Sequence, residues 1–417
     1  MPNVMVFPCG SQVGLEIRNS LTRQKNIKLI GCSSQPDKSA CLFDDFLVGG
    51  KNVFERGFVK SIADIVKKNS IDVIYAANDD AQLVLSKSRL RGKTIGSNHK
   101  TNEMLRSKSM TYSVLGNHLQ VPRSLKENPN FPLFFKPDRG SGSKDCHLVR
   151  SDAELKVLSE RFPEHVACEY LPGEEFTVDC FTDRNGKLLV SFGRSRIETR
   201  SGMAVQTSES GERPLQDMAA TINGKLYLRG PWFFQTKKDA SGNHVLLEVN
   251  TRIASCSSLT RMRGVNLSLL ALFDHMGEDC SIYENKRESQ TQSKFLYNVW
   301  VLESGYKRLY VDFDDCLCVD GKVNADLIKF VFECRNRGMR VDVLSKHSGD
   351  LKGEMMKLGI LGIFDEIMHI GKEERKSQIV DGDSILVDDS FNERIGSNCK
   401  CLVLSPDVFE FGSIVFV

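Results

Sequence analysis

The chain has 417 residues, of which 41% are hydrophobic and 26% are charged, and its formal net charge is +2. This length exceeds what one hydrophobic core usually serves and indicates two or three domains. The charge balance excludes a strongly basic nucleic-acid-binding protein, and no apolar run is long enough to cross a membrane. The 13 cysteines are scattered and suit free thiols in a reducing compartment, so we expect a soluble cytoplasmic protein.

The N-terminal part of the chain alternates strand-like and helix-like patterns. Short apolar runs at Val4–Pro8, Lys28–Ser33 and Asp72–Ala76 predict buried strands. An amphipathic pattern predicts a helix near Phe58–Asn69. Alternation of this kind is typical of a doubly wound α/β unit, so we predict a Rossmann-like domain over residues 1–97.

A lysine and a loop of small residues follow the next apolar strand. The strand Pro132–Pro137 carries Lys136 near its end, and Gly140-Ser141-Gly142-Ser143 comes directly afterwards. Small residues let backbone N–H groups approach phosphate oxygens, while the lysine ammonium neutralises their charge. Because the strand-like segment His147–Val149 follows, the pattern favours a phosphate-binding lid over a flexible hairpin tip.

Two polar strand faces lie further along the chain. Glu248, Asn250 and Arg252 are two residues apart, so they share one face of a strand. Carboxylate and carboxamide oxygens suit Mg²⁺, and the guanidinium suits a phosphate or carboxylate oxygen. Arg194 and Arg196 share a face in the same way and suit an anionic substrate, unless they form an exposed basic edge strand.

The order and approximate spacing of these segments resemble those of the ATP-grasp ligases. The resemblance covers about residues 1–290, includes Ala167–Asp179 between the loop and the Glu248 face, and is similar to the carbamoyl-phosphate-synthase-like branch. It implies an ATP-grasp domain over residues 98–290, which binds ATP with Mg²⁺ or Mn²⁺.

The resemblance also implies roles for individual residues. Those expected to hold ATP are Lys108, Lys136, Gly140, Ser141, Gly142, Ser143, Glu169, Leu171 and Glu175. Those expected to hold the metal are Gln235, Glu248 and Asn250, while Arg194 and Arg252 would act on the substrate. Many relatives have a carboxylate at the position of Gln235, so one of two metals is expected to bind weakly.

The last part of the chain carries a second set of acids. A polar stretch at Glu284–Lys294 predicts a linker, and the strand beginning at Arg308 runs into Asp312 and Asp314. Two carboxylates on one face can serve as a nucleophile and a proton donor, with Mg²⁺ shielding the charge. Further strands end at Ser345 and before Asp388.

This second set resembles the haloacid-dehalogenase-like (HAD) phosphatases and implies a domain over residues 305–417. By position, the expected nucleophile is Asp312 and the expected general acid/base is Asp314. Ser345 and Lys376 would bind phosphate, and the metal ligands would be Asp312, Asp314, Asp388 and Asp389. Cys316 stands where threonine is usual. The intervals between the motifs leave no room for an inserted cap domain.

These inferences predict an α/β protein with a Rossmann-like N-terminal domain, an ATP-grasp core and a C-terminal capless HAD-like domain. The predicted function is an ATP-dependent carboxylate–amine ligase that works through an acyl phosphate and has a second phosphomonoesterase site. Its partners would be a small carboxylate, an amine and a phosphorylated metabolite, with no nucleic acid or membrane, and a homodimer is left open. The alternatives are a small-molecule kinase and a nucleotide-responsive regulator with an inactive phosphatase fold.

Overall fold

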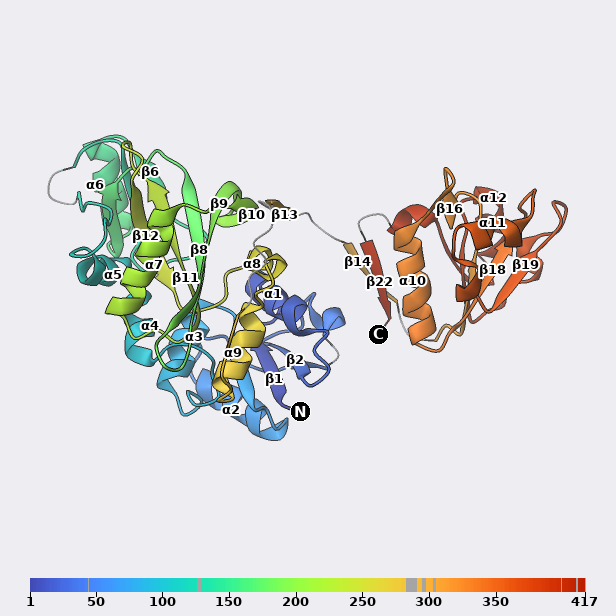
Figure 1. The fold of residues 1–417 in the computed structure, drawn as a ribbon, viewed down its shortest axis with the longest axis horizontal. Helices are drawn as coiled ribbons and strands as arrows, with labels where there is room; N and C mark the ends of the chain where they lie inside the picture. The colour runs from blue at the N-terminus through green and yellow to red at the C-terminus, as the bar shows by residue number, and fades with distance from the viewer. Residues whose placement is uncertain are drawn as a thin grey trace. The chain divides into compact units, whose positions relative to one another are not determined.

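The computed structural model describes residues 1–43, 45–125, 129–282, 291–294, 298–302, 305–398, 400–409 and 412–416. The chain divides into two compact units, Met1–Phe295 and Leu296–Val417, which Figure 1 draws from blue to yellow and from orange to red. Both units combine helices with sheets, so the predicted α/β class is confirmed. None of the described helices has the length and apolar character that a membrane crossing requires.

The N-terminal sheet of the first unit is parallel, with the strand order β3-β2-β1-β4. Its strands are β1 (Asn3–Phe7), β2 (Lys28–Ser33), β3 (Asp45–Val48) and β4 (Val73–Ala76). The helices around it are α1 (Gln12–Leu21), α2 (Phe58–Lys68), α3 (Asp79–Lys87) and α9 (Leu267–His275).

Alternation along β1 explains how both faces of this sheet are covered. Val4 and Val6 pack with residues of α1 and α9, whereas Met5 and Phe7 pack with residues of α2 and α3. Figure 1 shows α9, in yellow, beside α1 and β1. Helix α9 thus returns from a distant part of the sequence to complete the N-terminal core.

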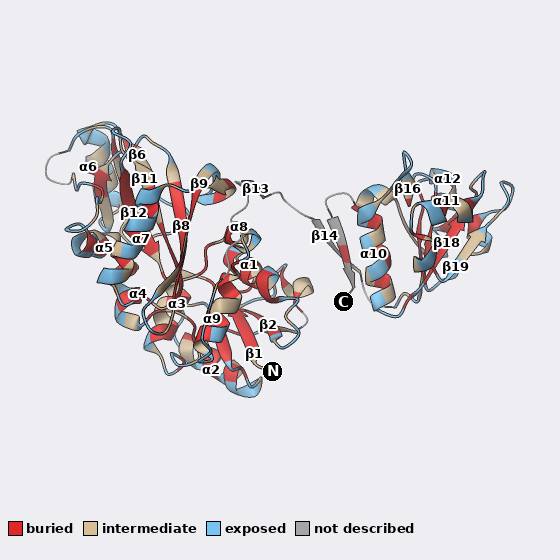
Figure 2. Ribbon diagram, in the orientation of Figure 1, coloured by how far each residue is buried: buried red, intermediate tan, exposed pale blue. Residues whose placement is uncertain are grey.

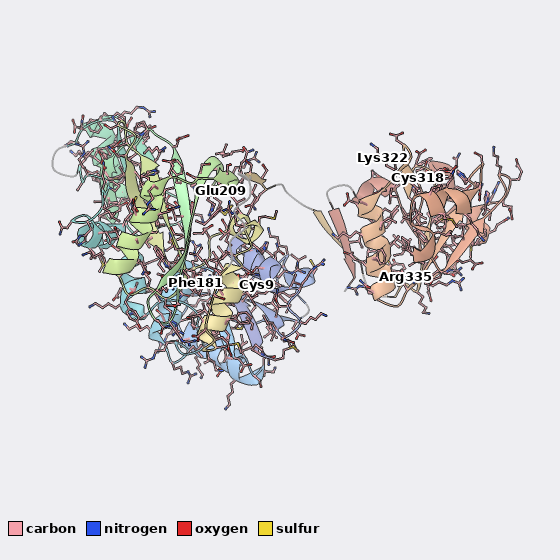
Figure 3. All side chains as sticks on the ribbon, viewed as in Figure 1. Cys9, Phe181, Glu209, Cys318, Lys322 and Arg335 are labelled. Carbon is pink, nitrogen blue, oxygen red and sulfur yellow. The ribbon has the colours of Figure 1, made fainter. Side chains whose placement is uncertain are left out.

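A six-stranded antiparallel sheet forms the centre of the first unit, with the order β12-β11-β8-β9-β10-β13. Its strands are β8 (Glu175–Thr182), β9 (Leu188–Arg200), β10 (Met203–Glu209), β11 (Gly230–Lys238), β12 (His244–Asn250) and β13 (Thr291–Ser293). Helix α7 (Arg213–Lys225) packs its apolar residues against β8, β11 and β12. On the opposite face, Phe181 joins the core that contains Cys9; Figure 3 labels both residues.

A three-stranded antiparallel sheet lies next in the unit, with the order β6-β5-β7. Its strands are β5 (Leu133–Pro137), β6 (His147–Val149) and β7 (His165–Glu169). The remaining α-helices of the unit are α4 (His99–Leu105), α5 (Lys108–Leu115), α6 (Asp152–Arg161) and α8 (Ser258–Met262), and the last of these contacts α1. Leu133 and Phe135 are buried on one face of β5 with Leu155 and Leu158 of α6. Figure 2 shows buried residues running along the strands of both sheets.

The second unit contains a parallel sheet with the order β19-β18-β15-β20-β21. Its strands are β15 (Arg308–Val311), β18 (Arg340–Ser345), β19 (Glu366–His369), β20 (Ser384–Val387) and β21 (Leu402–Leu404), and its helices are α10 (Ala325–Asn336), α11 (Leu351–Lys357) and α12 (Phe391–Ser397). A small hairpin joins β16 (Cys318–Val319) to β17 (Lys322–Val323), and a parallel pair joins β14 (Asn298–Leu302) to β22 (Gly412–Phe416).

The predicted linker at Glu284–Lys294 is wrong where the structure describes it. Residues 284–290 lie outside the described residues, but Thr291–Ser293 forms β13 and pairs with β10. An edge strand pairs its backbone on one side only and exposes the other side to solvent, so polar residues are compatible with this position. The six-stranded sheet therefore extends to Ser293, past the predicted end of the ATP-grasp domain at residue 290.

Candidate functional site

A single cavity of the first unit gathers the residues expected to hold ATP. Its lining includes Lys108, Lys136, Gly140, Ser141, Gly142, Ser143, Glu169, Leu171, Glu175, Gln235 and Glu248. These residues come from α5, β5 and its loop, the β7–β8 connection, β11 and β12. Segments far apart in sequence thus converge on one space that combines cations, backbone N–H groups and oxygen ligands.

Lys136 brings a buried positive charge to this cavity. Strand alternation buries Leu133 and Phe135 on one face of β5, and Lys136 lies on the other face, only 5% exposed. Its Nζ atom donates to the Tyr112 hydroxyl over 2.9 Å and has no ion-pair partner among the described residues. A buried ammonium without a counter-ion favours an anionic ligand.

The small-residue loop is held at both ends. Asp138 accepts hydrogen bonds from Ser107 Oγ and Ser109 N, 2.7 Å each, which ties the start of the loop to the start of α5. At the loop tip, Gly142 has a φ of +68°, a conformation that favours glycine. Gly202, in the turn between β9 and β10, lies so close that an added Cβ would be 2.6 Å from the Gly142 carbonyl carbon.

Glu169 and Glu175, which we expect near the adenine and ribose of ATP, each pair with an arginine side chain. Glu169 accepts from the Arg123 backbone N–H and side-chain Nε, at 3.0 and 2.7 Å. Glu175 lies 2.8 Å from Nε of Arg196, which also lines the cavity. Since these carboxylates already carry partners, ribose hydroxyls would have to share Glu175 with Arg196.

The predicted metal ligands come together through strand pairing. Gln235 of β11 is directly opposite Glu248 of β12, and residues opposite each other on adjacent strands lie close together. Asn250 donates its side-chain N–H to Glu248 over 3.1 Å, and Lys108 Nζ lies 3.7 Å from the same carboxylate. One carboxylate with two carboxamides is an oxygen donor set that fits Mg²⁺.

Arg252 is oriented by an acid of the N-terminal part of the unit. Its Nε and one terminal N–H group donate to the two oxygens of Asp79, over 2.8 and 3.0 Å. Burial opposes ionisation of Asp79, but the charge and hydrogen bonds of Arg252 outweigh it and lower the pKa of Asp79. Asp79 therefore stays ionised and holds the Arg252 guanidinium in a defined orientation.

Arg194 does not line the cavity, contrary to the expectation that it contacts a substrate. It is 2% exposed and donates from Nε to Asp179 over 3.0 Å, and Asp179 also accepts from Thr260 Oγ1. Arg194 and Arg196 both extend from β9, but the first is sealed under α8 by this ion pair. Because Arg194 lies outside the cavity lining and its guanidinium pairs with Asp179, the structure supports a structural role for it.

The second unit gathers another charged cluster where parallel strands end. Asp312 follows β15 and Asp388 follows β20, its neighbour in the sheet. Lys376 Nζ lies 2.8 Å from Asp312 and 2.6 Å from Asp388. Ser345, at the end of β18, is buried. Lys376 begins a single 3₁₀ turn, Lys376–Gln378.

The acids of this cluster have different surroundings. Burial and the neighbouring Asp312 carboxylate raise the pKa of Asp388 to about 6, although Lys376 opposes the shift. Asp389 Oδ1 accepts a long hydrogen bond from the Cys316 thiol. Asp314 lies apart, more than half exposed, with both its oxygens 3.0 Å from Nδ1 of His347.

Sequence reasoning missed several of these partners. His347 follows the end of β18 by two residues, and that position was the available signal for its approach to Asp314. Tyr112 and Asp79 are separated from Lys136 and Arg252 by tens of residues or more, so only the fold pairs them.

Comparison with known proteins places the first unit among known architectures. Residues 161–298 match a family model described as "ATP-grasp in the biosynthetic pathway with Ter operon". No curated protein sequence gives a significant match.

Solved structures similar to this chain include several carboxylases and ligases. The Campylobacter jejuni biotin carboxylase complex with β,γ-ATP has a TM-score of 0.56 at 14% identity, covering 67% of this chain and 72% of its own. The biotin carboxylase domain of Hydrogenobacter thermophilus 2-oxoglutarate carboxylase, solved with MgADP, ADP and bicarbonate, has a TM-score of 0.56 at 15% identity, covering 68% and 71%. Bacillus licheniformis L-amino acid ligase has a TM-score of 0.54 at 18% identity, covering 66% and 74%. The family-model match and these similarities together assign an ATP-grasp fold to the first unit.

Proposed function

We propose that the first unit is an ADP-forming ligase that joins a carboxylate to an amine. The observation that carries the proposal is the single cavity that unites Lys108, Lys136, the loop Gly140–Ser143 and the Gln235–Glu248 pair. This set supplies charge for phosphates and oxygen ligands for a divalent cation. The predicted carbamoyl-phosphate-synthase-like branch stays a prediction.

In the proposed reaction a substrate carboxylate oxygen attacks the γ-phosphorus of ATP and ADP leaves. The amine then attacks the carbonyl carbon of the acyl phosphate, loses a proton and displaces inorganic phosphate. Lys108 and Lys136 bind the phosphates, and the N–H groups of the loop Gly140–Ser143 donate hydrogen bonds to the phosphate oxygens. Gln235, Glu248 and Asn250 would hold Mg²⁺, which lowers the charge repulsion during phosphoryl transfer.

Arg252 is the cation that this proposal assigns to the acyl substrate. Asp79 fixes its guanidinium through two hydrogen bonds, so the side chain is already ordered before a substrate binds. The L-amino acid ligase that shares the fold supports an amino acid as one of the two substrates.

The Glu248→Ala variant tests the nucleotide site. We expect metal-dependent ADP formation to fall by about 100-fold or more, because removing a metal-centred electrostatic interaction costs several kcal/mol of transition-state stabilisation. ADP release should be measured over pooled carboxylates and amines, with mass detection of products. The matched control is Glu198→Ala, which removes a half-exposed carboxylate of β9 outside the cavity.

The two outcomes of that screen separate the ligase from a small-molecule kinase. A ligase yields ADP, phosphate and a new amide, whereas a kinase yields ADP and a phosphorylated compound. Normal ADP formation by a folded Glu248→Ala protein would contradict the proposal that Glu248 is a metal ligand.

A second candidate function, hydrolysis of a phosphate monoester, is supported by the cluster of the second unit. Lys376 bridges Asp312 and Asp388 in a buried setting, as a nucleophilic carboxylate with a phosphate-binding ammonium requires. Asp314 would supply the proton for the leaving group, with His347 as its partner.

The Asp312→Asn variant tests this second activity. We expect metal-dependent hydrolysis of a phosphometabolite panel by the full chain to fall by about 100-fold or more, because the amide is not nucleophilic. Asp320→Asn, on the turn of the β16–β17 hairpin, is the matched control and should keep full activity. Absence of hydrolysis by the unaltered protein would favour the regulator with an inactive phosphatase fold.

A further inference from the structure

Cys316 places a sulfur atom beside two carboxylates where β15 ends. Its Sγ atom and carboxylate oxygens of Asp312 and Asp389 all lie within 4.8 Å of one another. We propose that these three side chains bind a thiophilic divalent cation, with Zn²⁺ as the physiological example, in preference to Mg²⁺. The proposal uses the cluster of the second candidate function, but its test measures metal binding, so the two can fail separately.

The local backbone brings Cys316 back toward Asp312. The Leu317 N–H donates to the Asp312 carbonyl over 3.3 Å, and the Cys318 N–H donates to the Phe313 carbonyl over 2.9 Å. The segment therefore turns immediately after β15, and Cys316 becomes fully buried beneath the cluster. Cys316 belongs to the apolar core of the second unit, and its thiol at the edge of that core donates to Asp389 Oδ1 over 3.8 Å.

The charge around the sulfur favours a cation. Asp312, Asp388 and Asp389 surround it, and Lys376 is the one ammonium that pairs with them in the described part of this cluster. The cluster is therefore net negative when its carboxylates are ionised.

The sulfur decides which cation fits. Mg²⁺ takes oxygen ligands almost exclusively, whereas Zn²⁺ accepts a mixture of thiolate and carboxylate ligands and keeps a fourth position for water or substrate. The donor atoms around one tetrahedral zinc ion are about 3 to 4 Å apart, so a small rotation of the exposed Asp389 carboxylate closes the site. On binding, the thiol proton passes to solvent and the thiolate ligates the metal.

Titration of the metal-free full-length protein with Co²⁺ tests the proposal, because thiolate ligation produces a charge-transfer absorption band. We expect the unaltered protein to show this band and Cys316→Ser to lose it. The matched control is Cys318→Ser, because Cys318 is two residues further on, in the β16–β17 hairpin, where it pairs with Val323. Figure 3 labels Cys318 and, from the same hairpin, Lys322. That variant should keep the band.

Competition by Zn²⁺ gives the second measurement. The apparent Zn²⁺ affinity should fall at least about tenfold in Cys316→Ser, as expected on losing a thiolate ligand. Asp389 is exposed, so we expect Asp389→Asn to fold normally. Its apparent Zn²⁺ affinity should fall to a similar extent. Retention of the unaltered spectrum and Zn²⁺ affinity by Cys316→Ser, or displacement of Co²⁺ by equimolar Mg²⁺, would overturn the proposal.

Discussion

Lys136 and Arg194 are both buried cations of the first unit, yet they have different surroundings. Arg194 makes an ion pair with Asp179, whereas the described neighbours of Lys136 include a hydroxyl and two aromatic rings. Paired buried charges hold structure together, and an unpaired one is tolerated where a ligand supplies the opposite charge. This difference supports a structural role for Arg194 and the proposed phosphate-binding role of Lys136.

Replacing Arg194 with methionine should therefore affect stability and leave substrate affinity alone. The variant leaves the Asp179 carboxylate buried without its counter-charge, which costs about 3–5 kcal/mol. Urea unfolding followed by tryptophan fluorescence measures the loss. Arg200→Met, which breaks the exposed pair with Glu198, is the matched control and should cost at most about 1 kcal/mol. If the Arg194 variant had unchanged stability and a raised substrate KM, Arg194 would be a substrate ligand and not a structural residue.

The spacing of residues predicted which side chains share a face but not which of them are buried. Alternation placed Arg194 and Arg196 together on β9, and the structure agrees. The burial of Arg194 depends on Asp179 and Thr260, which only the folded sheet and α8 bring to it. A pattern confined to one strand carries no information about those partners.

Among the elements, the β9–β10 hairpin and the loop after β5 depend on each other. The tip of the hairpin, Ser201–Gly202, has positive φ values and lies against Gly142 and Ser143. Arg196 donates to the Gly202 carbonyl over 2.7 Å and also pairs with Glu175. The position of the loop Gly140–Ser143 is thus coupled to the strand that carries Arg196.

Replacing Gly202 with alanine should displace the phosphate loop. The new Cβ would lie 2.6 Å from the Gly142 carbonyl carbon, and alanine also disfavours the φ of +71° by about 1 kcal/mol. We expect the KM for ATP in ADP release to rise by about tenfold. Gly211→Ala has open space around it and serves as the matched control. Equal KM values for the two variants would contradict the coupling.

Elements differ in how well their sequences predict them. Strands β1, β2, β18 and β20 were predicted because their residues are apolar and buried on both faces. Strands β3, β13 and β19 are edge strands of three or four residues without a buried residue, so they are too short and too exposed to show a clear strand pattern. Their pairing partners decide their structure, and a local pattern does not contain those partners.

For the whole molecule, each proposed site is built within one unit. The ATP cavity uses residues of Met1–Phe295, and the Asp312–Lys376–Asp388 cluster uses residues of Leu296–Val417. The ordered motifs predicted this division because each group of motifs fell within one stretch of the chain. The predicted end of the ATP-grasp domain at residue 290 falls just short of β13 (Thr291–Ser293), which pairs with β10.

The unpaired ammonium of Lys136 has a thermodynamic consequence for the folded chain. Without nucleotide, the protein bears the desolvation cost of that charge, and a bound triphosphate removes the cost. Nucleotide at 100 times its dissociation constant should add about 2.7 kcal/mol to the free energy of unfolding. In Lys136→Met we expect the melting temperature of the nucleotide-free protein to rise and its increase with ATP to vanish, as differential scanning fluorimetry would record. The charge proposed to recognise the nucleotide would then also make the nucleotide-free protein less stable.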